Sequence, residues 1–262
     1  MNVSTLFDPI FLVPFFNGLL LALLLPIVGA YARLRGELLA SLGVTQMAAA
    51  GVGLGAFLGA NVMLGALLAA GVAASMKAIA GRQGGNDAYA VMLLAGWGAG
   101  LLLAANTTRG DELARALLQG QIYFTRGVHL QTIGAVVALA GLVMPWLSPR
   151  LLLGCFFPDY YLANGITTPR HDLVFDILLA TTLALSAIVV GVMGAFALVI
   201  LPPWVSFRFA QSWRSTLALA ALVGTVSYTA AFGVAILFDQ PFGPVLVVLL
   251  LVASLGRLLP VR

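Results

Sequence analysis

The chain has 262 residues, of which 61% are hydrophobic and 8% are charged, and its formal net charge is +4. Because soluble domains carry about 25% charged residues, this composition excludes a soluble enzyme, a disordered chain and a nucleic-acid-binding protein. A single cysteine, Cys155, excludes a disulfide framework. We expect an all-α integral membrane protein, a polytopic helical bundle surrounded by membrane lipid, with one transmembrane domain over residues 1–262.

A transmembrane helix needs about 20 apolar residues, and the uncharged intervals of the sequence predict about eight or nine membrane segments. The first lies between Asp8 and Arg33. Because no Lys or Arg precedes Arg33, we expect a membrane helix here rather than a cleaved signal peptide. Between Glu37 and Lys77 the uncharged run suits two helices joined by a turn near residues 59–61. Further spans are expected at 88–107, 128–147, 174–191, 216–238 and 243–259.

Residues 177–207 form an uncharged run that is too long for one crossing and short for two. Gly191, Gly194, Pro202 and Pro203 fall in its second half. We therefore predict a broken or re-entrant segment near 192–206. Such backbone is tolerated at membrane depth only where it is buried in protein or lines a cavity.

The placement of basic residues predicts the orientation of the chain. With the N-terminus outside, ten of the thirteen Lys and Arg residues fall in inner loops, and only Arg109, Arg115 and Arg126 fall outside. The positive-inside rule therefore favours an outer N-terminus and a cytoplasmic C-terminus. Residues 107–127 then lie outside, in the interface plane or on the bundle mouth, and residues 150–173 form the longest cytoplasmic connection.

The predicted helix at 38–59 carries Gly51, Gly55 and Gly59 at a spacing of four. This spacing puts the glycines on one helix face, where a neighbouring backbone can approach closely. Polar residues lie just before them. At membrane depth such residues either hydrogen-bond a neighbouring helix or line a pathway, and both interpretations stay open. The candidates for the translocation pathway are Thr45, Gln46, Met47 and, in the first span, Asn17.

Few residues of the sequence could bind ATP, ligate a metal ion or act in catalysis. Lys77 is the only lysine and is followed by Ala78, whereas a P-loop needs Gly-Lys-Ser/Thr. The chain is therefore expected to bind no ATP by itself, to carry no cofactor and to be no enzyme. His129 and His171 are far apart in sequence, so no metal site is predicted. Asp176, near the start of a span, is expected to cap a helix or snorkel rather than to conduct ions.

The cytoplasmic stretch predicts a short helix. Pro158 suits its first turn, Asp159 is favourable at its positive end, and Gly165 can end it. The adjacent Tyr160 and Tyr161 would then project into the cytoplasm, which is typical of a protein interface. The alternative is a helix lying on lipid headgroups. The segment comprises Phe157, Pro158, Asp159, Tyr160, Tyr161, Leu162, Ala163, Asn164 and Gly165.

Five motifs follow one another along nearly the whole chain. They are residues 33–59 with GVGLG at 51–55, LLQGQIYF at 117–124, FPDYYLANGI at 157–166, GVMGAFALVILP at 191–202, and Ser227-Tyr228 followed by DQPFGP at 239–244. In this order they resemble the motifs of ABC transporter permeases of the zinc, manganese and iron uptake type.

The resemblance implies a permease subunit in a bacterial cytoplasmic membrane. It implies a permease homodimer, separate ATPase subunits that use ATP, and an extracytoplasmic metal-binding protein. The segment 157–165 would be the coupling helix that docks on the ATPase. The permeases of this family carry an acidic residue and a histidine where this chain has Leu42 and Gln46. An amide and a thioether are weaker metal ligands than a carboxylate and an imidazole. We therefore expect a different metal, or a metal–chelator complex that needs no direct ligation.

Two other interpretations stay open. A cobalamin- or siderophore-type importer permease would also move chelates, although such chains are usually longer. A stand-alone secondary transporter would couple through intramembrane ionisable residues, for which Asp176 is the candidate. Stable association with an ATPase separates importers from secondary transporters.

Overall fold

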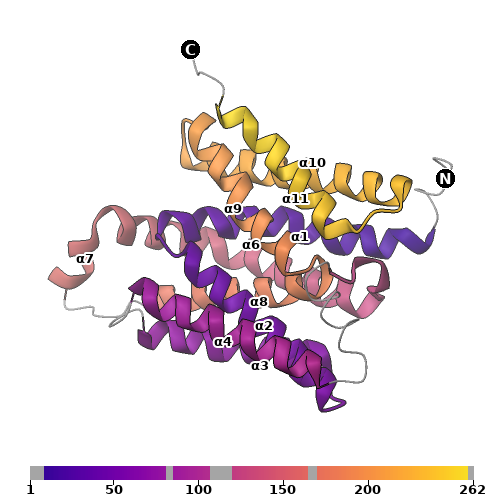
Figure 1. Ribbon diagram of the computed structural model, residues 1–262. Coiled ribbons are helices and arrows are strands. Elements are labelled where there is room, and N and C mark those ends of the chain that lie inside the picture. The colour runs from indigo at the N-terminus through magenta and orange to yellow at the C-terminus, as the bar shows by residue number, and fades with distance from the viewer. Residues whose placement is uncertain (1–8, 81–84, 107–119, 165–169, 259–262) are drawn as a thin grey trace.

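The computed structural model describes residues 9–80, 85–106, 120–164 and 170–258, and this part of the chain is helical with no strands (Figure 1). The all-α prediction is confirmed. Two short 3₁₀ segments are η2 (Ile122–Phe124) and η3 (Gly256–Leu258). The α-helices are α1 (Pro9–Leu34), α2 (Leu38–Phe57), α3 (Val62–Ala80), α4 (Gly85–Ala105), α6 (Gly127–Phe156), α7 (Pro158–Ala163), α8 (Arg170–Val189), α9 (Val192–Phe209), α10 (Trp213–Phe238) and α11 (Phe242–Leu255).

Seven of these helices are long and apolar enough to cross a membrane, and α3 and α11 are shorter apolar helices. Together they match the eight or nine predicted segments. With six residues, α7 is far too short to span about 30 Å of hydrocarbon. The bundle is therefore a polytopic membrane fold with one short helix outside the set of spans.

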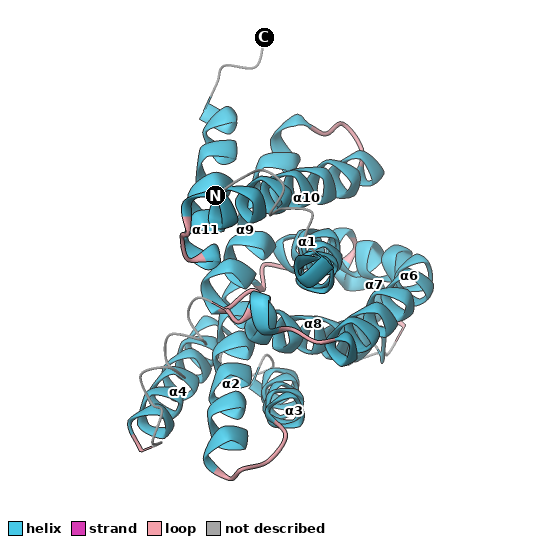
Figure 2. Ribbon diagram, turned by 90° about the vertical axis from the view of Figure 1, so that its right-hand side faces the viewer, coloured by secondary structure: helices cyan, strands magenta, loops and turns pink. Residues whose placement is uncertain are grey.

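The helices pack in three groups. Helices α9, α10 and α11 lie on one side and α2, α3 and α4 on the other, with α1, α6 and α8 between them (Figures 1 and 2). Helix α1 packs against α9 and α10, and α8 packs against α2 and α3. The fully buried side chains of this middle layer, such as Leu25, Tyr31, Phe175 and Leu183, form the centre of the hydrophobic core.

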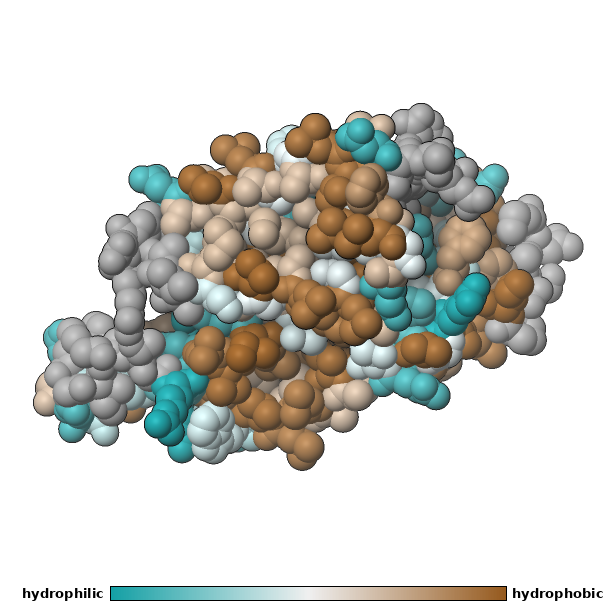
Figure 3. All heavy atoms as spheres, turned by 90° about the horizontal axis from the view of Figure 1, so that it is seen from below, coloured by the Kyte–Doolittle hydropathy of each residue, from teal (hydrophilic) through white to brown (hydrophobic). Residues whose placement is uncertain are grey.

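Successive spans run in alternate directions, so the connections gather at two ends of the bundle. One end, the η2 end, holds the start of α1, the α2–α3 turn, η2 and the α10–α11 turn (Figure 1). The other end, the α7 end, holds the α1–α2 turn, α7 and the α9–α10 turn. Nine Lys and Arg residues lie in the described ranges; Arg126 is at the η2 end and the other eight are at the α7 end. Figure 3 shows hydrophobic residues over the middle of one face and most hydrophilic ones toward its ends.

The segment predicted to be broken or re-entrant near 192–206 is a continuous helix. The break lies earlier, between α8 and α9, where Gly191 has a φ of 85° that glycine adopts at little cost. From there α9 runs unbroken, with Pro202 and Pro203 inside it. The run 177–207 holds two crossings because α8 begins at Arg170, seven residues before the uncharged run starts.

Helix α6 is 30 residues long and ends at Phe156, so it extends beyond the predicted span at 128–147. Pro145 and Pro149 lie inside the helix, and both are on its exposed side. On the opposite side Leu147 and Leu151 are buried and hold the helix against the core. Packing therefore outweighs the hydrogen bonds that the prolines remove, and the connection predicted at 150–173 begins only after Phe156.

Helices α2 and α3 meet backbone to backbone at the predicted glycine face. A Cβ atom added to Gly51 would lie 2.3 Å from the carbonyl oxygen of Gly65, and one added to Gly55 would lie 3.0 Å from Cα of Val62. Gly59, predicted on the same face, lies outside this contact: it follows the end of α2 with a φ of 65° and open space around it. Its physical role is the turn.

Tyr228 of α10 fills the gap left by another glycine. Its side chain is completely buried, and a Cβ on Gly18 of α1 would lie 2.3 Å from its hydroxyl oxygen. The hydroxyl donates to the carbonyl of Phe15 at 3.0 Å and approaches that of Pro14 at 3.4 Å. A polar tip that is satisfied by α1 explains why a tyrosine can occupy the interior of α10.

We predict that Gly51→Ala destabilises the protein by about 1–3 kcal/mol, because the added methyl group forces α3 away from α2. Gly71→Ala is the matched control, since Gly71 lies on α3 with nothing within 4 Å of an added Cβ. Alanine favours a helix over glycine by about 1 kcal/mol, so this variant should be neutral or stabilised. Thermal unfolding of the purified proteins in detergent compares them. Equal melting temperatures for the two variants would contradict the close contact.

Candidate functional site

The three pathway candidates on α2 have different surroundings. Thr45 is fully buried, and its hydroxyl donates to the carbonyl of Ser41 at 2.8 Å within the same helix. Met47 is half-buried against the core. Gln46 is also half-buried, and α4 passes so close that a Cβ on Gly96 would lie 2.6 Å from its carbonyl carbon. The side chain of Gln46 is therefore the candidate on α2 whose polar group is both partly accessible and not bonded within its own helix.

Asn17, the fourth pathway candidate, lies elsewhere. It sits on the half of α1 nearer the η2 end, whereas residues 45–47 sit on the half of α2 nearer the α7 end. Its side-chain amide donates to the carbonyl of Val13 at 2.9 Å and to the hydroxyl of Thr125 at 3.2 Å. Its Oδ1 is buried without a hydrogen-bond partner in the described part of the chain. The structure thus does not bring the four candidates together.

Residues 120–122 pack against the end of α8 at the η2 end of the bundle. Gly120 has a φ of 82°, and a Cβ there would lie 2.4 Å from the carbonyl carbon of Val190. The amide of Gln121 donates to the carbonyl of Ile188 at 3.2 Å, and Ile122 is buried. Phe124 of η2 is 81% exposed, so the two placements expected for 107–127 both stay open, and residues 107–119 lie outside the described ranges.

An aromatic cluster fixes this segment. The ring centroid of Tyr123 lies 6.1 Å from that of Phe11 and 5.9 Å from that of Phe232. Burial, together with the carboxylate of Asp239, raises the pKa of Tyr123 to about 12. Its hydroxyl is therefore neutral at physiological pH, and the segment is held to α1 and α10 by aromatic contacts rather than by a charge.

The predicted short helix is present as α7. Phe157 and Tyr160 are 63% and 50% exposed, so large aromatic surface is displayed at the α7 end. Asp159 is exposed in the first turn of the helix. Gly165, expected to end the helix, lies outside the described residues.

Tyr161 does not project into solvent as predicted. Its hydroxyl donates to the carbonyl of Arg150 at 3.2 Å, and its ring lies beside Gly154 of α6. Its ring centroid is 5.1 Å from that of His171, which is buried at the start of α8. Tyr161 therefore fastens α7 to α6 and α8, while Tyr160 faces outward.

Close to this contact lies a partly buried cluster of charges, which we call the charge cluster. Its members come from the α1–α2 turn, α3 and the first turns of α8, three segments far apart in sequence. The Lys77 ammonium contacts the carboxylates of Glu37, at 2.7 Å, and of Asp176. The five members are Arg35, Glu37, Lys77, Asp172 and Asp176.

Arg35 is the centre of the charge cluster. Its guanidinium donates to Glu37 at 3.0 Å and to Asp172 at 2.9 Å, and lies 3.7 Å from Asp176. Its planar group also stacks 5.1 Å from the ring centroid of Phe175. Burial lowers the pKa of Arg35, but the three carboxylates more than offset it and the pKa is raised. Arg35 therefore stays charged, and its charge holds the carboxylates in place.

The charge cluster corrects the interpretation of Asp176. We expected it to cap a helix or to snorkel, but it is 6% exposed and paired with Lys77, which is 4% exposed. Lys77 lies 99 residues away in sequence, so no local pattern could reveal the pair. One feature of the sequence could have indicated a buried partner. The only lysine of the chain lies at the end of an apolar helix, and no acidic residue is close to it in sequence.

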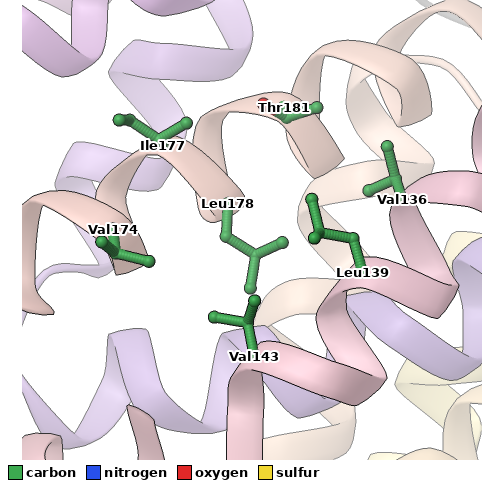
Figure 4. A pocket seen from close by; sticks show the side chains of 7 residues that line it. All are labelled: Val136, Leu139, Val143, Val174, Ile177, Leu178 and Thr181. Carbon is green, nitrogen blue, oxygen red and sulfur yellow. The ribbon is translucent and has the colours of Figure 1, made fainter. Parts of the chain in front are cut away.

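No group of three or more His, Cys, Asp or Glu residues in the described ranges could hold a metal ion. A cavity of about 160 Å³ lies between α6 and α8, and Figure 4 shows aliphatic side chains and Thr181 pointing into it. One hydroxyl among aliphatic groups offers no ligand set for a cation. This cavity is therefore not a candidate metal site.

The sequence of the chain is similar to that of known transport proteins. The sequence model of the ABC 3 transport family matches residues 8–259. The high-affinity zinc uptake system membrane protein ZnuB of Haemophilus influenzae is 28% identical over 116 residues. That match spans 44% of this chain and 44% of ZnuB, so the chain aligns with less than half the length of this curated relative.

Two solved structures share the fold. PsaBC from Streptococcus pneumoniae, in complex with a Fab, superposes with a TM-score of 0.84 at 18% identity, over 98% of this chain and 94% of that chain. An inward-facing structure assigned to the metal-chelate type of ABC transporter superposes with a TM-score of 0.78 at 14% identity, over 97% and 87% of the chains. At these identities the superpositions establish the arrangement of the helices.

We predict that Lys77→Met destabilises the protein by about 3–5 kcal/mol, because it leaves the buried carboxylate of Asp176 without its closest partner. Combining Lys77→Met with Asp176→Leu should recover most of this loss, since replacing both buried charges by apolar groups is often neutral. Melting temperatures of the three proteins in detergent test this. A double variant no more stable than Lys77→Met would show that the pair is not the interaction lost.

Proposed function

The chain belongs to the ABC 3 transport family, and from this membership we propose that it is the membrane permease subunit of an ATP-binding-cassette importer for a divalent metal ion or a metal chelate. The observation that carries the proposal is the family match over residues 8–259, nearly the whole chain. The metal cargo is supported by the similarity to ZnuB, a zinc uptake system membrane protein, and by the metal-chelate assignment of one solved neighbour.

ATP hydrolysis is assigned to separate ATPase subunits. The only lysine lies in the charge cluster and is followed by Ala78 rather than by Ser or Thr, so this chain has no P-loop. Helix α7 is the element proposed to dock on the ATPase. Its support is geometric: Tyr160 and Phe157 are exposed, while Tyr161 anchors the helix to the bundle.

The orientation follows from the charges at the two ends. Eight of the nine basic residues in the described ranges lie at the α7 end, so we place this end in the cytoplasm and the η2 end outside. The N-terminus is then outside and the C-terminus inside. An extracytoplasmic metal-binding protein would meet the η2 end, and a permease homodimer would complete the pathway.

The choice between an ion and a chelate depends on α2. Leu42 and Gln46 occupy half-buried positions on this helix, where the permeases that the sequence resembles carry an acidic residue and a histidine. Without a carboxylate or an imidazole, α2 offers only weak, uncharged ligands to a bare cation. We therefore favour a cargo that keeps its own ligands during passage, or a metal held by few protein contacts.

Cellular metal content tests the cargo. A strain lacking the gene is compared with its complemented parent under chelator starvation, by mass spectrometry of zinc, manganese, iron and other transition metals. We expect a selective fall in one metal in the deletion strain, reversed by complementation. Equal contents of every metal in the two strains would contradict metal import and favour an organic cargo.

We predict that Tyr160→Ala weakens binding of the ATPase subunit by about thirtyfold or more, because truncating an exposed aromatic anchor at a protein interface costs about 2 kcal/mol or more. Trp97→Ala is the matched control, since Trp97 is 51% exposed but lies within the span α4. The affinity is measured with purified subunits in detergent. Unchanged affinity for Tyr160→Ala would show that α7 lies on lipid headgroups or is only a connection.

A further inference from the structure

The charge cluster lies directly behind the proposed docking element. Asp172 is the third residue of α8, the helix that the chain enters after α7 and residues 164–169. Its neighbour His171 packs against Tyr161 of α7. Asp172 then contacts Arg35 of the α1–α2 turn. A continuous path of contacts therefore leads from the exposed face of α7 to the beginning of α2.

The path continues to the helix pair that carries the pathway candidates. Arg35 is bonded to Glu37 through two nitrogens, at 2.9 and 3.0 Å, and Glu37 directly precedes α2. Glu37 and Asp176 share the ammonium of Lys77 at the end of α3. The inner ends of α2, α3 and α8 are thus held to one another by charge-assisted hydrogen bonds, the strongest kind that side chains make.

Burial makes this connection stiff. The side chains of Arg35, Lys77 and Asp176 are 12%, 4% and 7% exposed. Separating any of these charges would leave an uncompensated charge in a poorly solvated place, which is costly. The members therefore have to move together or not at all. Asp172 differs, because its side chain is 35% exposed and it provides the link of the charge cluster to the α7 side.

We infer that the charge cluster is the mechanical joint of the permease. It transmits displacement of α7 by the ATPase to α2 and α3, with Asp172 as the positioning residue that connects the two. The inference rests on the proposed function, since only an ATP-driven partner would displace α7. The charge cluster has a link on the α7 side. The contact between Asp172 and Arg35 is that link.

Asp172→Asn tests the joint with little risk to folding. The amide removes the charge of the link, while Arg35 keeps Glu37 and Asp176 and Lys77 keeps both its carboxylates. The permease, its ATPase and its binding protein are reconstituted in proteoliposomes. Uptake of zinc, manganese and iron(II), each supplied as the free salt and as its citrate chelate, is measured by mass spectrometry, together with ATP hydrolysis in the same preparation.

We expect Asp172→Asn to keep most of the ATP hydrolysis while metal uptake per ATP falls about fivefold, the lower end of coupling between distant sites. Asp172→Glu keeps the charge and should keep the ratio. Asp87→Asn is the matched acid-to-amide control, because Asp87 is exposed in the first turn of α4 at the same end of the bundle.

Three results would overturn the inference. An unchanged ratio for Asp172→Asn would show that the link carries no motion. A parallel loss of uptake, hydrolysis and melting temperature would assign the charge cluster a purely stabilising role. Absence of ATP-driven metal uptake by the unmodified complex would contradict the proposed function itself. The inference about the charge cluster, which rests on that function, would then fail as well.

Discussion

One buried ammonium group sets the geometry of the α7 end. Lys77 could not be buried in an apolar bundle without the carboxylates of Glu37 and Asp176, and these carboxylates could not be buried without Lys77 and Arg35. The requirement that all these charges be paired fixes how the α1–α2 turn, α3 and α8 meet. The position of α7 follows, because Tyr161 rests on the first residues of α8.

Charge spacing predicted most of the fold because a membrane allows few exceptions: an apolar run of about 20 residues has to cross. The errors arose where packing decides. Helix α6 passes Pro145 and Pro149 since its opposite side is buried, and α9 passes Pro202 and Pro203, which are themselves buried. Sequence alone shows that a proline removes a hydrogen bond, but not how much burial compensates for it.

The candidate site was predicted less completely. The short helix α7 could be found because its signals, Pro158 and Asp159, are local. Which of Tyr160 and Tyr161 faces solvent could not be predicted, since this depends on the contacts of α7 with α6 and α8. The charge cluster escaped prediction for the same reason: its members are brought together by α1, α3 and α8, and a single sequence contains no record of that contact. Asn17 and Gln46, both polar at membrane depth, turned out to lie in different halves of the bundle.

The burial of Lys77 also has a consequence for the chemical reactivity of the protein. Lys77 carries the only side-chain amine in the sequence, and in the folded state it lies between two carboxylates and is 4% exposed. Acylating reagents need a free, accessible amine. Acylation of this one side chain is therefore expected to be slow, and its rate would report how often the inner ends of α3 and α8 separate.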